Sequence, residues 1–247
     1  MWLAIVLLAG AVLGAGGLVG FVPATRAARW LKPLLAFSGA YLFTLTITHL
    51  LPEALTLPGS AGRLGYWVLG GFFGQLVLEV FSEGVEHGHV HAPAAGAGPA
   101  RGRVPGLLVL ALVLHSGLEG SILVRGAGSG TVDTRFYALV LGIALHHVPA
   151  AVALATLLRL RLGSFGRVWP WLGLFALASP AGLVFSNYFA LSQLLGPGTY
   201  AALLGFVVGT FLHVSTTILF ETSPEHRLNW PKLAATLAGL LLALAVS

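Results

Sequence analysis

The chain of 247 residues contains no cysteine and very few charged residues. Without cysteine it can form no disulfide, use no thiolate nucleophile and build no thiolate metal site. Charged residues make up 9% of the sequence, against about 25% in a soluble domain, and hydrophobic residues make up 57%. The mean hydropathy is +0.90. These values predict an integral membrane protein embedded in a lipid bilayer.

The net charge of +5 indicates membrane orientation, and we expect no nucleic-acid partner. Apolar segments predict eight helices, at residues 2–22, 33–55, 64–83, 104–125, 135–158, 168–192, 197–219 and 230–247. Ten Arg and Lys residues lie in or beside the loops after the first, third, fifth and seventh helices, and three lie in the other loops. The positive-inside rule therefore places both termini outside the cytoplasm, and we expect a protein of the cell (inner or plasma) membrane.

We expect an all-α membrane protein with a single transmembrane domain over residues 1–247. The third loop, residues 84–103, is the longest and least apolar. It contains His87, His89 and His91, followed by a run of Ala, Gly and Pro, which predicts a flexible cytoplasmic loop. The alternative is a polar loop with incidental histidines. We favour metal handling by this loop, because so few other histidines lie outside the apolar segments.

Two helix ends share an order of polar residues. The second helix ends with His49, two spacers, proline and Glu53, and the seventh ends with Glu221, two spacers, proline and Glu225. Because these two helices cross the membrane in opposite directions, the two stretches lie at opposite faces. The pattern predicts an inverted repeat of helices 1–3 and 6–8 around a helix 4–5 transport element, which is typical of transporters.

Two apolar segments carry polar residues near their middles. His115 and Glu119 are four residues apart in the fourth segment and so share one helix face, and His146 lies in the fifth, three residues before Pro149. Ionisable groups at the membrane midplane are costly and usually functional. Imidazole and carboxylate together suit a divalent transition metal. We therefore predict a metal site from these three residues, the alternative being packed, hydrogen-bonded polar side chains.

Taken together, the motifs resemble those of the ZIP family of divalent-metal transporters. The matching stretches are His49-Leu-Leu-Pro-Glu53, His115-Ser-Gly-Leu-Glu119-Gly120, His146-His-Val-Pro149, Ser179-Pro-Ala-Gly182 and Glu221-Thr-Ser-Pro-Glu225-His226. The resemblance implies a carrier that moves zinc or iron into the cytoplasm. It also implies that His115, Glu119 and His146 bind the metal within the fourth and fifth helices.

The same resemblance implies a path for the metal through the membrane. His49 and Glu53 would form its outer entrance. Glu221 and Glu225 would form its inner exit, beside the loop of residues 84–103.

Two positions depart from the family pattern. The family usually has a glutamate after the proline of the fifth helix, where this chain has Ala150, and many members have one before the proline of the sixth, where it has Ser179. These losses suggest one metal per site. Ser116 and His147 stand where a second metal would find other ligands, and His147 either donates or lines the path.

Two histidines and a glutamate suit Zn²⁺, with Fe²⁺, Mn²⁺, Co²⁺ and Cd²⁺ as further candidates. We expect a transporter and not an enzyme. One alternative is a membrane-embedded zinc hydrolase, although the sequence has neither His-Glu-x-x-His nor Gly-x-Ser-x-Gly. The other is a non-transporting metal sensor of the same fold, which Ala150 and Ser179 favour. Glycine-rich faces in the first and sixth helices fit either a homodimer interface or packing within one bundle.

Overall fold

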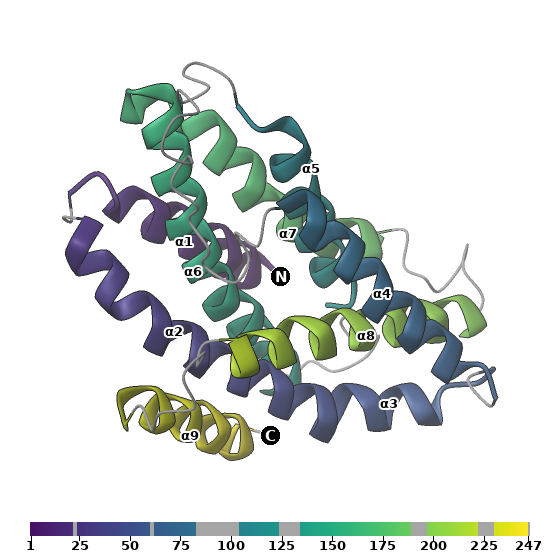
Figure 1. Cartoon of the computed structure of the whole chain (residues 1–247). Coiled ribbons are helices and arrows are strands. Elements are labelled where there is room, and N and C mark those ends of the chain that lie inside the picture. Colours follow the sequence, from purple (N-terminus) through teal and green to yellow (C-terminus); the bar gives the residue numbers. More distant parts are fainter. Residues whose placement is uncertain are drawn as a thin grey trace.

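The computed structural model describes residues 1–21, 24–59, 62–82, 104–123, 134–188, 197–221 and 230–246. Its helices are α1 (Trp2–Leu18), α2 (Ala24–Leu45), a π-helical turn (Thr46–Leu50), α3 (Leu51–Thr56), α4 (Leu64–Ser82), α5 (Gly106–Ser121), α6 (Thr134–Leu162), a 3-10 turn (Phe165–Arg167), α7 (Trp169–Tyr188), α8 (Pro197–Glu221) and α9 (Trp230–Ala245). The described residues contain no strand, which confirms the all-helical prediction (Figure 1).

Each of the eight predicted helices corresponds to a helix of the structure, with α2, the π-helical turn and α3 in place of the second. Five helices are long and apolar enough to cross a membrane, at Trp30–Thr56, Leu64–Ser82, Thr134–Leu162, Phe165–Tyr188 and Gly198–Phe220. The apolar helices α1, α5 and α9 have 17, 16 and 16 residues. A perpendicular span needs about 20 residues, so these three are short for one.

Helix α2 begins at Ala24, upstream of the start predicted at residue 33. Basic residues interrupt the apolar pattern in this part of the chain, so hydropathy excludes it. Alanine, arginine, leucine and lysine nevertheless have high helix propensity, and the helix also passes through Pro33.

The π-helical turn locally widens the continuous helix formed by α2 and α3, just before Pro52. The backbone N–H of Leu51 donates to the carbonyl of Thr46, five residues back. In a regular helix the ring of Pro52 would collide with the carbonyl of Thr48, and a π-helical turn is one of the few ways to relieve that clash. The turn contains His49, so the chain is locally reshaped where the sequence predicts the entrance.

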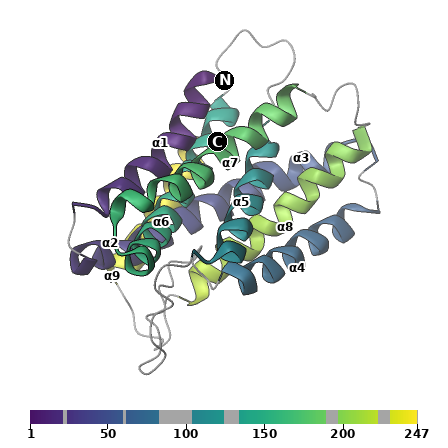
Figure 2. The same cartoon turned by 90° about the horizontal axis from the view of Figure 1, so that it is seen from above.

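Helix packing follows four main pairs. Helix α4 packs along α8, α2 along α9, α5 along α7 and α1 along α6 (Figures 1 and 2). Helix α1 also contacts α7, and α2 contacts both α6 and α8. One hydrophobic core fills the space between α1, α5, α6 and α7, and includes Leu112, Leu154 and Leu172. The two helices with mid-chain histidines, α5 and α6, are thus each supported by a partner helix.

Glycines bring the backbones of α5 and α7 into direct contact. A methyl group on Gly120 would collide with the carbonyl of Ser179, and one on Gly182 would collide with the carbonyl of Gly117. Small residues permit this close approach of helices in membranes. Because Gly120 follows Glu119, the contact fixes α5 beside the predicted metal site.

Candidate metal site

Three predicted ligands lie together in the interior. His115, Glu119 and His146 each offer one ligand atom, and these atoms all lie within 4.8 Å of one another. Their side chains are buried, with residue exposures of 2%, 0% and 1%. His115 Nε2 lies 3.1 Å from Glu119 Oε1, and the rings of His115 and His146 meet edge to face at a centroid distance of 5.9 Å. Such a buried group of two imidazoles and a carboxylate can hold a divalent metal ion.

His147 completes the polar group from the side opposite His115. Its Nε2 lies 2.7 Å from Glu119 Oε2, so the two carboxylate oxygens of Glu119 face one histidine each. The ring of His147 also packs against Phe175 of α7 at a centroid distance of 5.4 Å. Neighbouring positions on α6 thus both reach the site, because Glu119 projects between α5 and α6 and contacts the second of the two histidines.

Two buried serines lie on the helices that frame the site. Ser116 follows His115 on α5, and Ser179 on α7 lies against Gly120. Neither hydroxyl has a hydrogen-bond partner among the described residues. A buried polar atom without a partner costs about 1–3 kcal/mol of stability. Such an atom often has a functional role or binds an ion or a water molecule. Ser116 therefore remains a candidate metal donor. Ser179 stands where the family resemblance implies a glutamate, and its side chain is polar but neutral.

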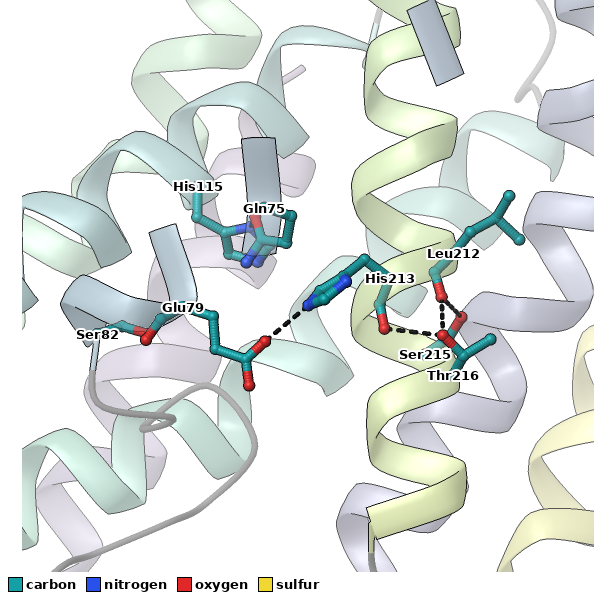
Figure 3. A network of polar contacts seen from close by, with 8 residues as sticks. All are labelled: Gln75, Glu79, Ser82, His115, Leu212, His213, Ser215 and Thr216. Carbon is teal, nitrogen blue, oxygen red and sulfur yellow. Dashed lines mark hydrogen bonds and ion pairs between the residues drawn. The ribbon is translucent and has the colours of Figure 1, made fainter. Parts of the chain in front are cut away.

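Helix α4 contributes two residues that the sequence analysis did not select. Gln75 Oε1 lies 2.9 Å from His115 Nδ1, and one turn further Glu79 Oε2 lies 2.7 Å from His213 Nε2 on α8 (Figure 3). The residues are four apart and so share a helix face. Gln75 and Glu79 are polar residues in an otherwise apolar segment, and this pattern could have marked them as functional candidates. The pattern does not reveal which neighbouring helix they contact.

The two predicted entrance residues line one pocket beside the π-helical turn and α3. His49 and Glu53 share a cavity of about 410 Å³ with Thr48 and Arg135. His49 Nδ1 lies 2.7 Å from Thr48 Oγ1, and the Tyr200 hydroxyl donates to Glu53 Oε1 over 3.5 Å. The structure therefore brings the two predicted residues together and adds a guanidinium from the start of α6.

In a carrier that takes up Zn²⁺ through this pocket, as the family resemblance implies, replacement of Arg135 by glutamine should raise uptake at low ionic strength by about two- to tenfold, because a positive side chain at the entrance lowers the local concentration of the metal cation. The gain should shrink towards 0.5 M salt, where screening is strong. The matched control is Arg63→Gln, which removes an exposed charge on the same expected face but outside this pocket. Initial uptake rates into vesicles measure both, and equal changes in the two variants would contradict a local effect of Arg135.

Several predicted residues cannot be placed. The loop histidines His87, His89 and His91 and the exit residue Glu225 lie outside the described residues. Glu221 is the last residue of α8, and its side chain is outside the description too. Their roles remain predictions.

The fold and the site define a helical integral membrane protein with a buried group that can hold a divalent metal. No family model matches the sequence. The chain is similar to a protein named zinc transporter ZIP1 from Takifugu rubripes, with 32% identity over 146 residues. The similarity covers 58% of this chain and 44% of that relative. The chain thus spans less than half of the length of the curated relative it matches, and the similarity supports metal transport in general terms.

Proposed function

We propose that the protein is a ZIP-family carrier that moves a divalent transition metal, chiefly Zn²⁺, across the cell membrane into the cytoplasm. The observation that carries the proposal is the buried group of His115, Glu119 and His146. Two imidazole nitrogens and one carboxylate oxygen form a ligand set that Zn²⁺ prefers, and three protein ligands leave a coordination position for water. The partial similarity to a zinc transporter points to the same substrate.

In this proposal the site holds one metal ion. Glu119 binds it with the oxygen that faces His115, while His147 holds the other oxygen and keeps the carboxylate oriented. Ser116 and His147 are further donors on either side. Ala150 and Ser179 are neutral, so neither of these two positions adds a carboxylate beside the site, which favours a single ion that is bound loosely enough to be released.

The proposed path begins outside at the pocket of His49 and Glu53 and ends at the inner end of α8. Its inner part would comprise Glu221 and Glu225, with His87, His89 and His91 in the cytoplasmic loop. With both termini outside, a path in this direction delivers metal to the cytoplasm.

We also propose that the eight helices span the membrane as an inverted repeat, and the helix pairs support this idea. In such a repeat α1, α2 and α4 correspond to α7, α8 and α9, and α5 corresponds to α6. The observed α1·α6 pair then corresponds to the observed α7·α5 pair. The α4·α8 pair corresponds in the same way to the α9·α2 pair. Because α5 packs along α7 and α6 along α1, movement of the site would carry all four helices. This moving unit is wider than the helix 4–5 element expected from the sequence.

The test is Zn²⁺ influx into proteoliposomes that contain the full chain and an internal zinc-sensitive dye. A carrier gives influx that saturates with external Zn²⁺ and exceeds the leak of protein-free vesicles. Binding of Zn²⁺ without influx would instead support a sensor. Hydrolysis of a membrane substrate without influx would support the hydrolase alternative.

A further inference from the structure

The hydrogen bond between Gln75 and His115 connects the candidate metal site to a helix that contributes no ligand. His115 Nδ1 and Gln75 Oε1 are 2.9 Å apart, and Gln75 is completely buried in α4. Both side chains are labelled in Figure 3, where they overlap in the line of sight. A buried amide in an apolar helix is costly unless it is hydrogen-bonded, so this contact constrains both partners.

The chemistry of this contact determines which nitrogen of His115 is free to bind metal. An amide oxygen accepts hydrogen bonds and cannot donate one, so His115 Nδ1 must carry the proton. In the neutral ring, which is the form that binds metal, Nε2 then carries the lone pair. It faces Glu119 Oε1 at 3.1 Å, and an ionised carboxylate also has only lone pairs to offer. Two such atoms repel unless a proton or a metal cation lies between them, so a metal ion bound at Nε2 would relieve this repulsion.

We propose that Gln75 is a positioning residue that holds His115 in the Nδ1–H tautomer and directs Nε2 at the metal. The proposal rests on the proposed function, in which His115 is a ligand. A metal at Nε2 withdraws charge from the ring and makes Nδ1–H a stronger donor, so the bond to Gln75 should tighten when metal binds. Occupancy of the site is thereby coupled to the position of α4.

The position of α4 is itself well defined. One turn beyond Gln75, Glu79 Oε2 lies 2.7 Å from His213 Nε2 on α8. Nearer the start of α4, a methyl group on Gly71 would collide with the carbonyl of Phe206, so the backbones of α4 and α8 are in contact. Helix α4 can therefore hold Gln75 at a fixed place relative to α8 while it orients a ligand on α5.

The opposite amide orientation makes a contrary prediction. If the NH₂ group of Gln75 faced Nδ1, the proton would sit on Nε2 and bond to Glu119. Zn²⁺ would then have to displace that proton, and Gln75 would hinder binding. Removal of the amide distinguishes the two orientations, because it weakens metal binding in the first case and strengthens it in the second.

The experiment is equilibrium Zn²⁺ binding to the full chain in detergent, for the parent, Gln75→Met and Gln75→Glu. Methionine keeps the size of the side chain but loses the acceptor, so affinity should fall by about 10–100-fold, the range found for outer partners of metal-binding histidines. A carboxylate is the stronger acceptor, so Gln75→Glu should bind at least as tightly as the parent. The matched control Ser82→Ala removes a buried hydroxyl that donates to the carbonyl of Glu79 on the same helix, and it should leave affinity unchanged.

Unchanged or tighter binding by Gln75→Met would overturn the positioning role. Should this variant fail to fold, ¹⁵N NMR of the histidine-labelled parent, with His115→Ala to assign the resonance, reads the tautomer directly. An Nδ1–H signal supports the proposal and an Nε2–H signal contradicts it. Absence of Zn²⁺ binding by the parent itself would contradict the proposed function instead, so the two failures are distinguishable.

Discussion

Replacement of Glu119 by glutamine should reduce the affinity of the protein for Zn²⁺ by more than about 100-fold, beyond the range typical of outer-shell partners. Glu119 is the carboxylate of the candidate ligand group, and its two oxygens lie 3.1 Å from His115 and 2.7 Å from His147. Without it, a buried divalent cation would keep neutral ligands and no compensating charge. Competition with a chromophoric chelator in detergent measures the affinity of both proteins.

The matched control for this loss is Glu79→Gln. Glu79 also pairs with a histidine, with Oε2 at 2.7 Å from His213 Nε2, but it is not part of the three-ligand group. Its replacement should lower Zn²⁺ affinity by no more than about tenfold, because it removes no ligand and acts on the site only through the position of α4 and Gln75. An equal loss in the two variants would show that acid–histidine pairs stabilise the protein generally, and that Glu119 is not a ligand.

A methyl group at Gly120 should destabilise the folded protein by about 1–3 kcal/mol, the usual cost of overpacking. The new Cβ of Gly120→Ala would meet the carbonyl and Cα of Ser179, which are backbone atoms and cannot rotate away. Helices α5 and α7 would have to separate beside Glu119. Thermal unfolding in one detergent should therefore show a lower midpoint for this variant, with weaker Zn²⁺ binding at temperatures where it remains folded.

Gly117→Ala supplies the comparison on the same helix. A Cβ at Gly117 would lie 3.8 Å from the carbonyl of Ala178, an ordinary contact distance. Both substitutions gain about 1 kcal/mol of helix propensity, so the difference between them reports packing alone. We expect Gly117→Ala to be neutral or stabilising. Equal midpoints for the two variants would contradict direct backbone contact between α5 and α7.

The sequence predicts the membrane class and the helices because both follow from local composition. An apolar run of spanning length has few alternatives to a helix in lipid, and the four-residue spacing of His115 and Glu119 places them on one face whatever surrounds them. The predicted start of α2 was wrong because that prediction also used local composition alone. Hydropathy is blind to a polar stretch that continues a helix beyond the apolar part.

Contacts between helices are the part that the sequence could not predict. The contact of Glu119 with His147, the bond from Gln75 to His115 and the position of Arg135 in the entrance pocket each depend on how neighbouring helices are rotated about their axes. Periodicity identifies a polar face within one helix but not the face it meets. Glycines set these rotations through close backbone contacts. In the sequence they cannot be told apart from the other glycines of membrane helices.

The most direct test of the account measures Zn²⁺ influx in matched proteoliposomes that contain the parent, His115→Ala or Glu119→Gln at equal protein content. Saturable influx is expected in the parent and a fall to the level of protein-free vesicles in both variants, while Glu79→Gln should keep saturable influx above that level. Influx that persists undiminished in His115→Ala and Glu119→Gln would contradict the account, because metal would then cross the membrane without using the buried site.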